Sequence, residues 1–268
     1  ILIESVLRSG ALQAEQVTVS NRTPQKALAL VERCPGITVA ASNEEVVKNS
    51  SVVFLCIKPL EFKNVLSEIQ NIVDAEQIVV SITSPVLVSQ LEELLPCKIA
   101  KVIPSITNFA FGGAALCMYG TSMNDDDKEK LEQLLAHIST PVRISEEYAR
   151  TASDLSSCGP AFLAFFLQNF IDAATEETGI PREQATRLAS EMLLGTGKLL
   201  TQAGFTPQTL QKRVAVPGGI TAEGLRMLAD EMNGTFNRLI RTTHGKYAED
   251  LAKVKMMLFS TKVERDAL

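Results

Sequence analysis

The sequence predicts an α/β fold in which a doubly wound, mostly parallel sheet comes first and an all-helical domain follows. Short apolar runs alternate with helical periodicities to about residue 145, strand signals stop from Glu146 onward, and the rest shows only helical patterns. Because alternating strands and helices form right-handed crossovers, we expect a parallel sheet with helices on both faces. The expected domains are residues 1–145 and 146–268.

The first domain contains predicted helices and strands in succession. Apolar residues have helical spacing from the start, and Thr23-Pro24 provides an N-cap followed by proline at the first helical position. The continuous apolar run from Val52 to Leu55 suits a parallel strand that is buried on both faces. Strands are predicted at 16–20, 51–57, 77–82 and 98–103, with helices at 1–9, 23–31, from Asn43, and at 60–72 and 86–95. Edge strands at 112–119 and 142–144 flank an amphipathic helix with Leu131, Leu134, Leu135 and Ile138.

The second domain is predicted to contain helices over 160–175, 181–202 and 221–232, and a long helix beyond Gly234. The first of these is apolar around most of its circumference, so it needs burial in a core or against a second subunit. In so small a helical domain, an interwoven homodimer or higher homo-oligomer is the favoured explanation.

The composition excludes several classes of protein. The 268 residues include 26 Lys and Arg against 31 Asp and Glu, and this net charge of −5 argues against a nucleic-acid partner or an anionic membrane surface. No apolar run reaches the roughly 18 residues of a membrane span. Five scattered cysteines suit a reducing cytoplasm, and the two histidines lack metal-binding spacing. We therefore expect a cytoplasmic protein without a metal.

The first candidate site is Ser20-Asn21-Arg22-Thr23, because ligands of a doubly wound sheet bind outside the carboxyl ends of its strands. In a dinucleotide site this strand end meets the adenosine ribose, where an acidic residue accepts from both hydroxyl groups and an arginine suits a 2′-phosphate. No acidic residue is present in the segment, so NADP is favoured over NAD. Alternatively, Thr23 only caps its helix and Arg22 is solvated; both interpretations can hold together.

Two other strand ends give weaker signals. Cys56-Ile57-Lys58-Pro59 brings a lysine and a rigid turn to the same crevice, although strands that end in Lys-Pro are common at protein surfaces. The segment 101–108 places Ser105, Thr107 and Asn108 just past another strand, which is also the pattern of an ordinary turn.

The most informative segment is 215–224, which contains Gly218, Gly219 and Thr221. Two glycines followed by a threonine at a helix start expose successive backbone N–H groups at the positive end of the helix dipole, a receptor for a carboxylate. Taken alone, the pattern favours a plainer interpretation, a glycine turn with Thr221 as an ordinary N-cap.

Together and in this order, these segments resemble the pyrroline-5-carboxylate reductase family along nearly the whole chain. The family's Val-Lys-Pro strand end corresponds to Ile57-Lys58-Pro59, its Ser-Gly-Ser-Gly-Pro-Ala-Tyr segment to residues 156–162, and its Ser-Pro-Gly-Gly-Thr-Thr motif to residues 216–221. The resemblance implies a Rossmann-type NADP-binding domain, a helical dimerisation domain, and NADPH-dependent reduction of 1-pyrroline-5-carboxylate to L-proline.

The resemblance also implies roles for single residues. Thr221 faces the imine and the carboxylate as the catalytic residue, and Gly218 and Gly219 bind the substrate with it. A cyclic imine takes its proton before or during hydride arrival, so orientation of the reactants and one hydroxyl group near the ring nitrogen suffice without histidine. The implied cofactor-binding residues are Asn21, Arg22, Asn43, Cys56, Ile57, Lys58 and Pro59.

Three departures from the family pattern point to one branch of it. Family members usually have Met-Pro-Asn-Thr-Pro at residues 103–107, Ala-Ala-Gly or Ala-Gly at Thr83-Ser84, and a serine at Val216. The lost serine removes a donor from the expected carboxylate site. These segments are most similar to the late competence protein ComER branch. The alternative expectation is therefore a ComER-like paralogue with weak or no reductase activity, acting as a binding or regulatory module.

The start of the sequence also differs from the family. Family members open with a short strand and a Gly-x-Gly-x-x-Gly loop, whereas this sequence begins where the following helix would be under way. Because that strand is central in a doubly wound sheet, its absence would divide the sheet and remove the pyrophosphate site. The expectation is an incomplete gene product.

Overall fold

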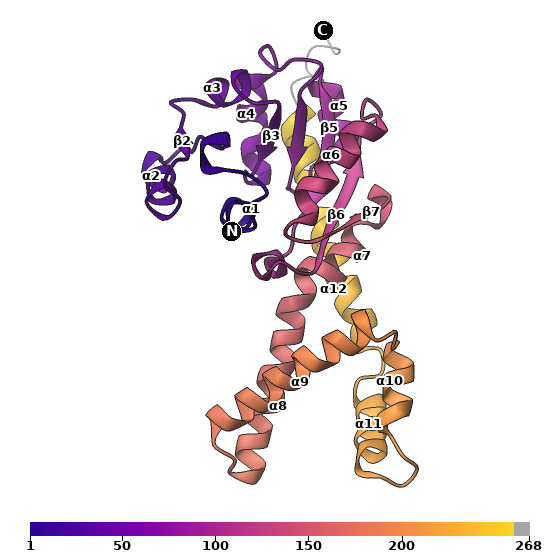
Figure 1. Cartoon of the computed structure of the whole chain (residues 1–268). Helices are drawn as coiled ribbons and strands as arrows, with labels where there is room; N and C mark the ends of the chain where they lie inside the picture. Colours follow the sequence, from indigo (N-terminus) through magenta and orange to yellow (C-terminus); the bar gives the residue numbers. More distant parts are fainter. Residues whose placement is uncertain (260–268) are drawn as a thin grey trace. The chain divides into compact units, whose positions relative to one another are not determined.

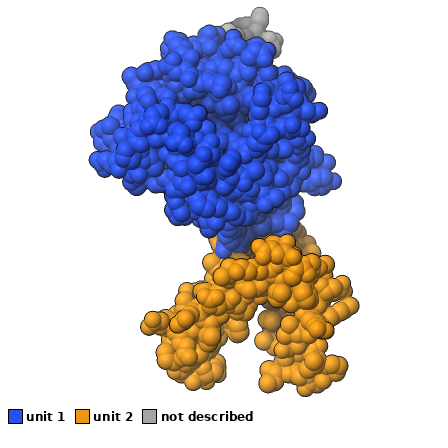
Figure 2. Space-filling view, viewed as in Figure 1, with its two compact units in different colours: residues 1–160, 242–268 blue, residues 161–241 orange. Residues whose placement is uncertain are grey.

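The computed structural model describes residues 1–259, which form two compact units. The first contains residues 1–160 and the described residues from Thr242 onward, and the second contains Ala161–Arg241 (Figure 2). Helices α8 (Gly159–Thr178) and α12 (Thr235–Phe259) belong in part to both units. The division at residue 145 stays a prediction.

The first unit contains a five-stranded sheet in the order β3-β4-β5-β6-β7. Strands β3, β4 and β5 are parallel, as predicted, whereas β6 is antiparallel to β5 and β7 pairs parallel with β6. The predicted edge position is correct for β7 and wrong for β6, because β7 pairs along the other side of β6. The short 104–113 connection carries no crossover helix, so the chain returns antiparallel beside β5. The strands are β3 (Val52–Leu55), β4 (Ile78–Ser81), β5 (Lys98–Ile103), β6 (Ala114–Tyr119) and β7 (Thr140–Arg143).

A separate two-stranded sheet consists of β1 (Thr18–Val19) and β2 (Thr38–Val39), which are parallel. Among the described residues it does not pair with the larger sheet. The sequence did not indicate β2, since two residues are too few to show the alternation of apolar and polar side chains that marks a strand. The helices of this part are α1 (Leu2–Arg8), α2 (Pro24–Arg33) and α3 (Asn43–Lys48).

Helices cover both faces of the larger sheet, as the alternation predicted (Figure 1). Strand β4 is buried along its whole length, and its successive residues Val79 and Val80 belong to opposite cores. Val79 packs in the core that contains Phe62, and Val80 packs in the core that contains Leu131 and Leu135. The first core is covered by α4 (Phe62–Ile69), α5 (Val88–Leu94) and the end of α12, and the second by α6 (Asp125–Ala136).

A buried ion pair ties β5 to its neighbours. Lys101 is completely buried; its Nζ lies 2.6 Å from Glu146 Oε1 and donates to the carbonyl oxygen of Ser84 at 3.0 Å. The Glu146 carboxylate also accepts from the backbone N–H of Val88, the first residue of α5, at 3.0 Å. Tyr247 of α12 donates to the same Ser84 carbonyl at 3.2 Å. Burial lowers the pKa of Lys101, although Glu146 opposes this shift, so several elements meet around one desolvated charge.

The second unit is helical, as predicted, and contains most of α8, then α9 (Arg182–Gln202), α10 (Pro207–Val214), α11 (Ile220–Glu231) and the start of α12. Sequence analysis missed α10, although Thr206-Pro207 was a usable signal: Thr206 Oγ1 accepts from the Thr209 N–H at 3.1 Å. It also missed α7 (Ala149–Ser153) and the π-helix Asp154–Cys158, which precede α8 in the first unit.

The second unit leaves much of its apolar surface uncovered. Ile171 and Ala185 are buried, but α8 exposes 67% of both Phe165 and Phe170. This chain alone therefore does not supply the burial that the sequence of α8 demands. Other exposed apolar side chains of the unit include Leu163, Leu188, Met192, Leu194, Met227 and Phe236. In the described residues, no helix is long and apolar enough to cross a membrane.

Candidate functional site

The predicted cofactor residues lie in the first unit, where the chain leaves β1 and β3 and where α3 begins. After β1, the Asn21 Oδ1 accepts from the Thr23 N–H at 2.9 Å, which closes a tight turn ahead of α2. Thr23 occupies the N-cap position of α2 but makes no side-chain cap hydrogen bond there. The turn leaves the Arg22 side chain 80% exposed, so its guanidinium is accessible to an anion.

Arg22 has a partner that the sequence did not indicate. Its Nη1 lies 2.6 Å from Oε1 of Glu61, whose side chain is 33% exposed. Glu61 ends the short 3₁₀ helix Pro59–Glu61, which begins directly after Lys58. The structure thus brings the ends of β1 and β3 together through an ion pair. The NADP prediction rested on the absence of an acidic residue in 20–23, and no spacing rule connects a glutamate in another loop with Arg22.

The other residues at these strand ends have distinct environments. Ile57 accepts from Thr83 Oγ1 through its carbonyl oxygen at 2.8 Å, which ties the end of β3 to the segment after β4. Lys58 is exposed and extended ahead of Pro59, and Cys56 is exposed. Asn43 is the first residue of α3, and its Nδ2 donates to Glu68 Oε2 of α4 at 2.6 Å. Accessible guanidinium and ammonium groups beside polar backbone suit the phosphates of a dinucleotide.

The polar side chains of the 101–108 segment form hydrogen bonds within and around their own turn. Ser105 Oγ accepts from the Thr107 N–H at 3.3 Å, and Asn108 Oδ1 accepts from the Ser105 N–H at 2.8 Å. Asn108 also donates to the carbonyl of Gly112 at 2.9 Å, and Ser105 donates to that of Ser156 at 2.9 Å. Both side chains are buried. These polar groups therefore stabilise a loop, which agrees with the interpretation of the segment as an ordinary turn.

The predicted substrate residues lie together in the second unit, at the start of α11. Gly218 has φ +74°, a left-handed conformation that favours glycine. A Cβ on Gly219 would lie 2.7 Å from Val216 Cγ2 and 3.1 Å from the Val216 carbonyl oxygen, so a side chain there would displace Val216. The shape of the turn therefore favours glycine at both positions.

The N-cap of α11 lies two residues before Thr221, the expected N-cap. Gly219 is the N-cap of α11, and its carbonyl oxygen accepts from the N–H groups of Ala222 and Glu223. The prediction that Thr221 is the N-cap is wrong, because the Val216–Gly219 turn already ends the extended backbone. Ile220 and Thr221 precede the first helical hydrogen bond, so their N–H groups point out of the helix start, where the dipole is positive.

Thr221 lines a hollow of about 330 Å³ between α9, α10 and α11. The wall is mostly aliphatic: besides Thr221, its polar residues are Thr196 and Gln211. Val216, at the outside of the turn, is 62% exposed, and Ile220 is 95% exposed. The aliphatic residues of the wall are Leu200, Pro207, Leu210, Val214 and Leu225.

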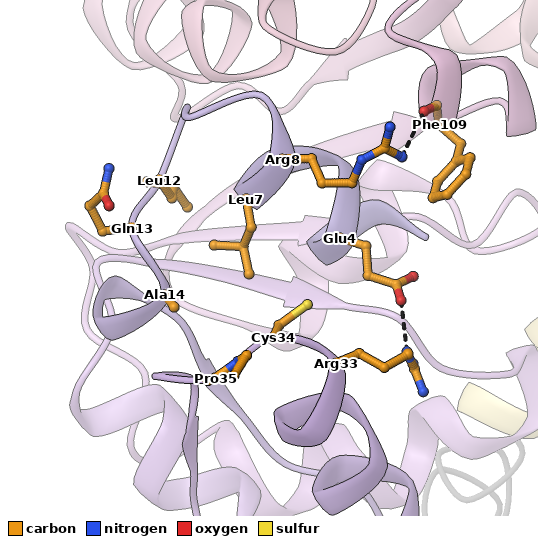
Figure 3. Close-up of a pocket in the computed structure, with 10 residues that line it drawn as sticks. All are labelled: Glu4, Leu7, Arg8, Leu12, Gln13, Ala14, Arg33, Cys34, Pro35 and Phe109. Carbon is orange, nitrogen blue, oxygen red and sulfur yellow. Dashed lines mark hydrogen bonds and ion pairs between the residues drawn. The ribbon is translucent and has the colours of Figure 1, made fainter.

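A larger hollow of about 430 Å³ in the first unit is not formed by predicted site residues (Figure 3). It lies among α1, the residues that follow it, the end of α2 and Phe109. Arg8 donates to the Phe109 carbonyl oxygen at 3.3 Å and lies over its ring, and Arg33 bonds Glu4 at 2.8 Å. These contacts hold both arginines at the rim of the hollow.

The histidines lie outside both groups of predicted site residues. His137 is exposed just past α6, and His244 Nε2 lies 3.3 Å from Thr151 Oγ1 in the first unit. In the part of the chain that the structure describes, no group of three or more His, Cys, Asp and Glu side chains could hold a metal ion.

Comparison with protein families divides the chain into two matched regions. Residues 1–85 match the model "NADP oxidoreductase coenzyme F420-dependent". Residues 146–250 match the model "Pyrroline-5-carboxylate reductase dimerisation".

Individual relatives extend over nearly the whole chain. ComE operon protein 4 of Bacillus subtilis (strain 168) is 42% identical over 255 residues, which cover 95% of this chain and 93% of that protein. Pyrroline-5-carboxylate reductase 3 of Rattus norvegicus is 31% identical over 229 residues, covering 85% and 82%. The crystal structure of Plasmodium falciparum pyrroline carboxylate reductase with NADP bound has a TM-score of 0.79 at 22% identity, covering 96% and 93%. That structural likeness confirms the predicted fold.

Proposed function

Because the chain belongs to the pyrroline-5-carboxylate reductase family, we propose that it reduces the cyclic imine 1-pyrroline-5-carboxylate to L-proline with NADPH. The relative that is 31% identical over most of both chains establishes the family, and the predicted NADP oxidoreductase domain is confirmed by the match of residues 1–85. The reaction, the substrate and the site residues make up the proposal.

The start of α11 is the observation that carries the proposal. Gly218 and Gly219 let the backbone turn sharply, and the N–H groups of Ile220 and Thr221 then face outward at the positive helix end. We assign the substrate carboxylate to these N–H groups and the ring nitrogen to the Thr221 hydroxyl. A hydroxyl so placed stabilises the iminium and amine forms by hydrogen bonding, and a stronger acid is not required for an imine that is protonated before reduction.

The cofactor side of the proposal uses the residues at the ends of β1 and β3. Arg22 pairs with the adenosine 2′-phosphate, and Asn21, Asn43 and the Cys56–Pro59 segment line the dinucleotide. Bound NADPH supplies the hydride that the imine carbon receives. The protein's own task is to orient the two reactants and to hold the carboxylate, which needs no titrating histidine.

A second candidate function is a competence-related module with weak or no reductase activity. It is favoured by the identity of 42% to ComE operon protein 4 and by Val216, an exposed valine at a position where the family usually has a serine. One missing hydrogen bond to a charged group is worth about 1.5–3 kcal/mol of binding.

The two candidate functions predict different rates of imine reduction. In the full-length protein, NADPH oxidation followed at 340 nm with 1-pyrroline-5-carboxylate is the direct measurement. Reductase activity in the wild type supports the first function, and we expect Val216→Ser to lower KM by about tenfold or more through the restored hydrogen bond. NADPH binding without turnover in the wild type, together with activity in Val216→Ser, would establish the second function instead. Val214→Ser, on the hollow rather than the turn, is the control and should not lower KM.

We also propose that the chain is a homodimer with a dimerisation domain over residues 146–268, of which 260–268 lie outside the described residues, following an NADP-binding domain over residues 1–145. The match of 146–250 to a dimerisation model supports a homo-oligomer, and the exposed Phe165 and Phe170 supply apolar surface for a partner copy. Light scattering should give twice the chain mass, and a monomer at micromolar concentration would contradict the proposal. A reducing cytoplasm, favoured by the scattered cysteines, is the proposed location.

A further inference from the structure

We infer that Glu61 sets how strongly the protein prefers NADPH over NADH, by competing with the cofactor for Arg22. The inference rests on the proposed function in one respect: it takes Arg22 as the residue that meets the adenosine 2′-phosphate. Glu61 is a specificity-determining residue in this scheme and takes no part in the chemical step.

The local structure holds Glu61 close to Arg22. Lys58 is extended (φ −68°, ψ 149°), and Pro59 then starts the single 3₁₀ turn that ends at Glu61 and leads into α4. Proline fixes φ at this step, so the direction of the turn has little freedom. The turn places Oε1 of Glu61 2.6 Å from Nη1 of Arg22, which follows the separate strand β1. The Glu61 carboxylate is half-buried against the turn while the Arg22 side chain is 80% exposed, so Arg22 is the partner that a ligand can reach.

The Arg22–Glu61 ion pair affects the affinity for the two cofactors differently. The 2′-phosphate of NADPH binds Arg22 only if the Arg22–Glu61 ion pair breaks, and it then lies close to the negative charge of Glu61. Both effects weaken NADPH binding. NADH carries a 2′-hydroxyl group instead, and a carboxylate close to the ribose is the usual acceptor for that hydroxyl. Arg22 therefore favours NADPH and Glu61 reduces that preference. We propose that the protein binds both cofactors with a narrow margin between them.

Equilibrium binding to the full-length protein tests this directly. The probes are NADPH and NADH, with adenosine 2′,5′-bisphosphate and adenosine 5′-monophosphate as fragments that isolate the 2′-phosphate. We expect Glu61→Gln to tighten NADPH and the bisphosphate by about fivefold, a limit set by the small worth of exposed ion pairs. NADH should bind equally or more weakly, because Gln is a poorer acceptor. Arg22→Gln should weaken NADPH by about tenfold, because a charge-assisted contact is lost.

Two controls separate pairing from general charge effects. Glu76→Gln removes another ion-paired carboxylate of the same unit, the partner of Lys98 at 2.8 Å, and should leave all four ligands within about twofold. In the Arg22→Gln background, Glu61→Gln should change NADPH affinity by no more than about twofold, since the competition is gone.

The outcomes also distinguish this inference from the proposed reaction. If Glu61→Gln alters neither the NADPH nor the bisphosphate affinity while imine turnover is normal, the inference is wrong and the reductase assignment stands. If the predicted shifts occur in a protein that turns over no imine, the inference is supported and the reductase assignment fails. A wild type that binds neither dinucleotide contradicts both.

Discussion

Replacing Thr221 by alanine should lower kcat/KM for 1-pyrroline-5-carboxylate by about 10- to 100-fold, the equivalent of one hydrogen bond to a charged group at roughly 1.5–3 kcal/mol. The reason is local: Thr221 lies in the first turn of α11, beside the outward-facing N–H groups, and lines the hollow among α9, α10 and α11. Steady-state kinetics with NADPH is the measurement, and NADPH affinity should change little because the nucleotide residues lie elsewhere in the chain.

The control variants are Thr221→Ser and Thr196→Ala. Serine keeps the hydroxyl group and should retain most of the rate. Thr196→Ala removes a threonine from the wall of the same hollow, and the mechanism does not use that residue. If Thr196→Ala reduced activity as much as Thr221→Ala, the effect would come from packing of the helices. In that case the catalytic assignment of Thr221 would be wrong.

The second large effect is on stability. Glu146→Ala should lower the free energy of unfolding by about 3–5 kcal/mol, because it leaves the fully buried Lys101 ammonium without its carboxylate and the Val88 N–H without its acceptor. Urea denaturation followed by circular dichroism provides the measurement. Glu147→Ala is the matched control: this neighbouring residue is exposed, and its loss should cost no more than about 0.5 kcal/mol.

Lys101→Met separates the charge from the packing. It removes the desolvated ammonium, and Glu146 remains partly exposed and still accepts from Val88. The loss of unfolding free energy should therefore be clearly smaller than for Glu146→Ala.

The pH dependence of the unfolding free energy gives a second readout. Because burial lowers the pKa of Lys101, the unfolded chain binds its proton more tightly than the folded chain. The wild type should therefore gain stability relative to Lys101→Met as pH rises from the lowered pKa towards 10.5, the unperturbed value. An equal or opposite slope would contradict the assignment of the buried charge.

Much of the fold was predictable because the core strands have strong local patterns. The uncharged run Val52–Leu55 and the fully buried β4 could be recognised from composition alone. The antiparallel direction of β6 could not, because periodicity describes which faces are apolar and not the direction in which a strand runs. The π-helix Asp154–Cys158 was likewise invisible, since a single wide turn is too short to show a period of its own.

The candidate site was predictable only in part, for a physical reason. Gly218 and Gly219 could be found because a left-handed φ at one and crowding against Val216 at the other favour glycine, and such a preference is visible in the sequence. The partner of Arg22 is different: Glu61 comes from another loop, and only the fold brings the two together. The role of Ser105 and Asn108 in their own turn was left open by the sequence and decided by their buried hydrogen bonds.

The composition of β3 also bears on how the protein is handled. β3 lies within Ser-Val-Val-Phe-Leu-Cys-Ile, a segment without charge, proline or glycine, which is the composition from which cross-β aggregates grow. In concentrated and partly denatured preparations, we expect aggregation to begin at this segment, and thioflavin T fluorescence should fall when Phe54 is replaced by lysine.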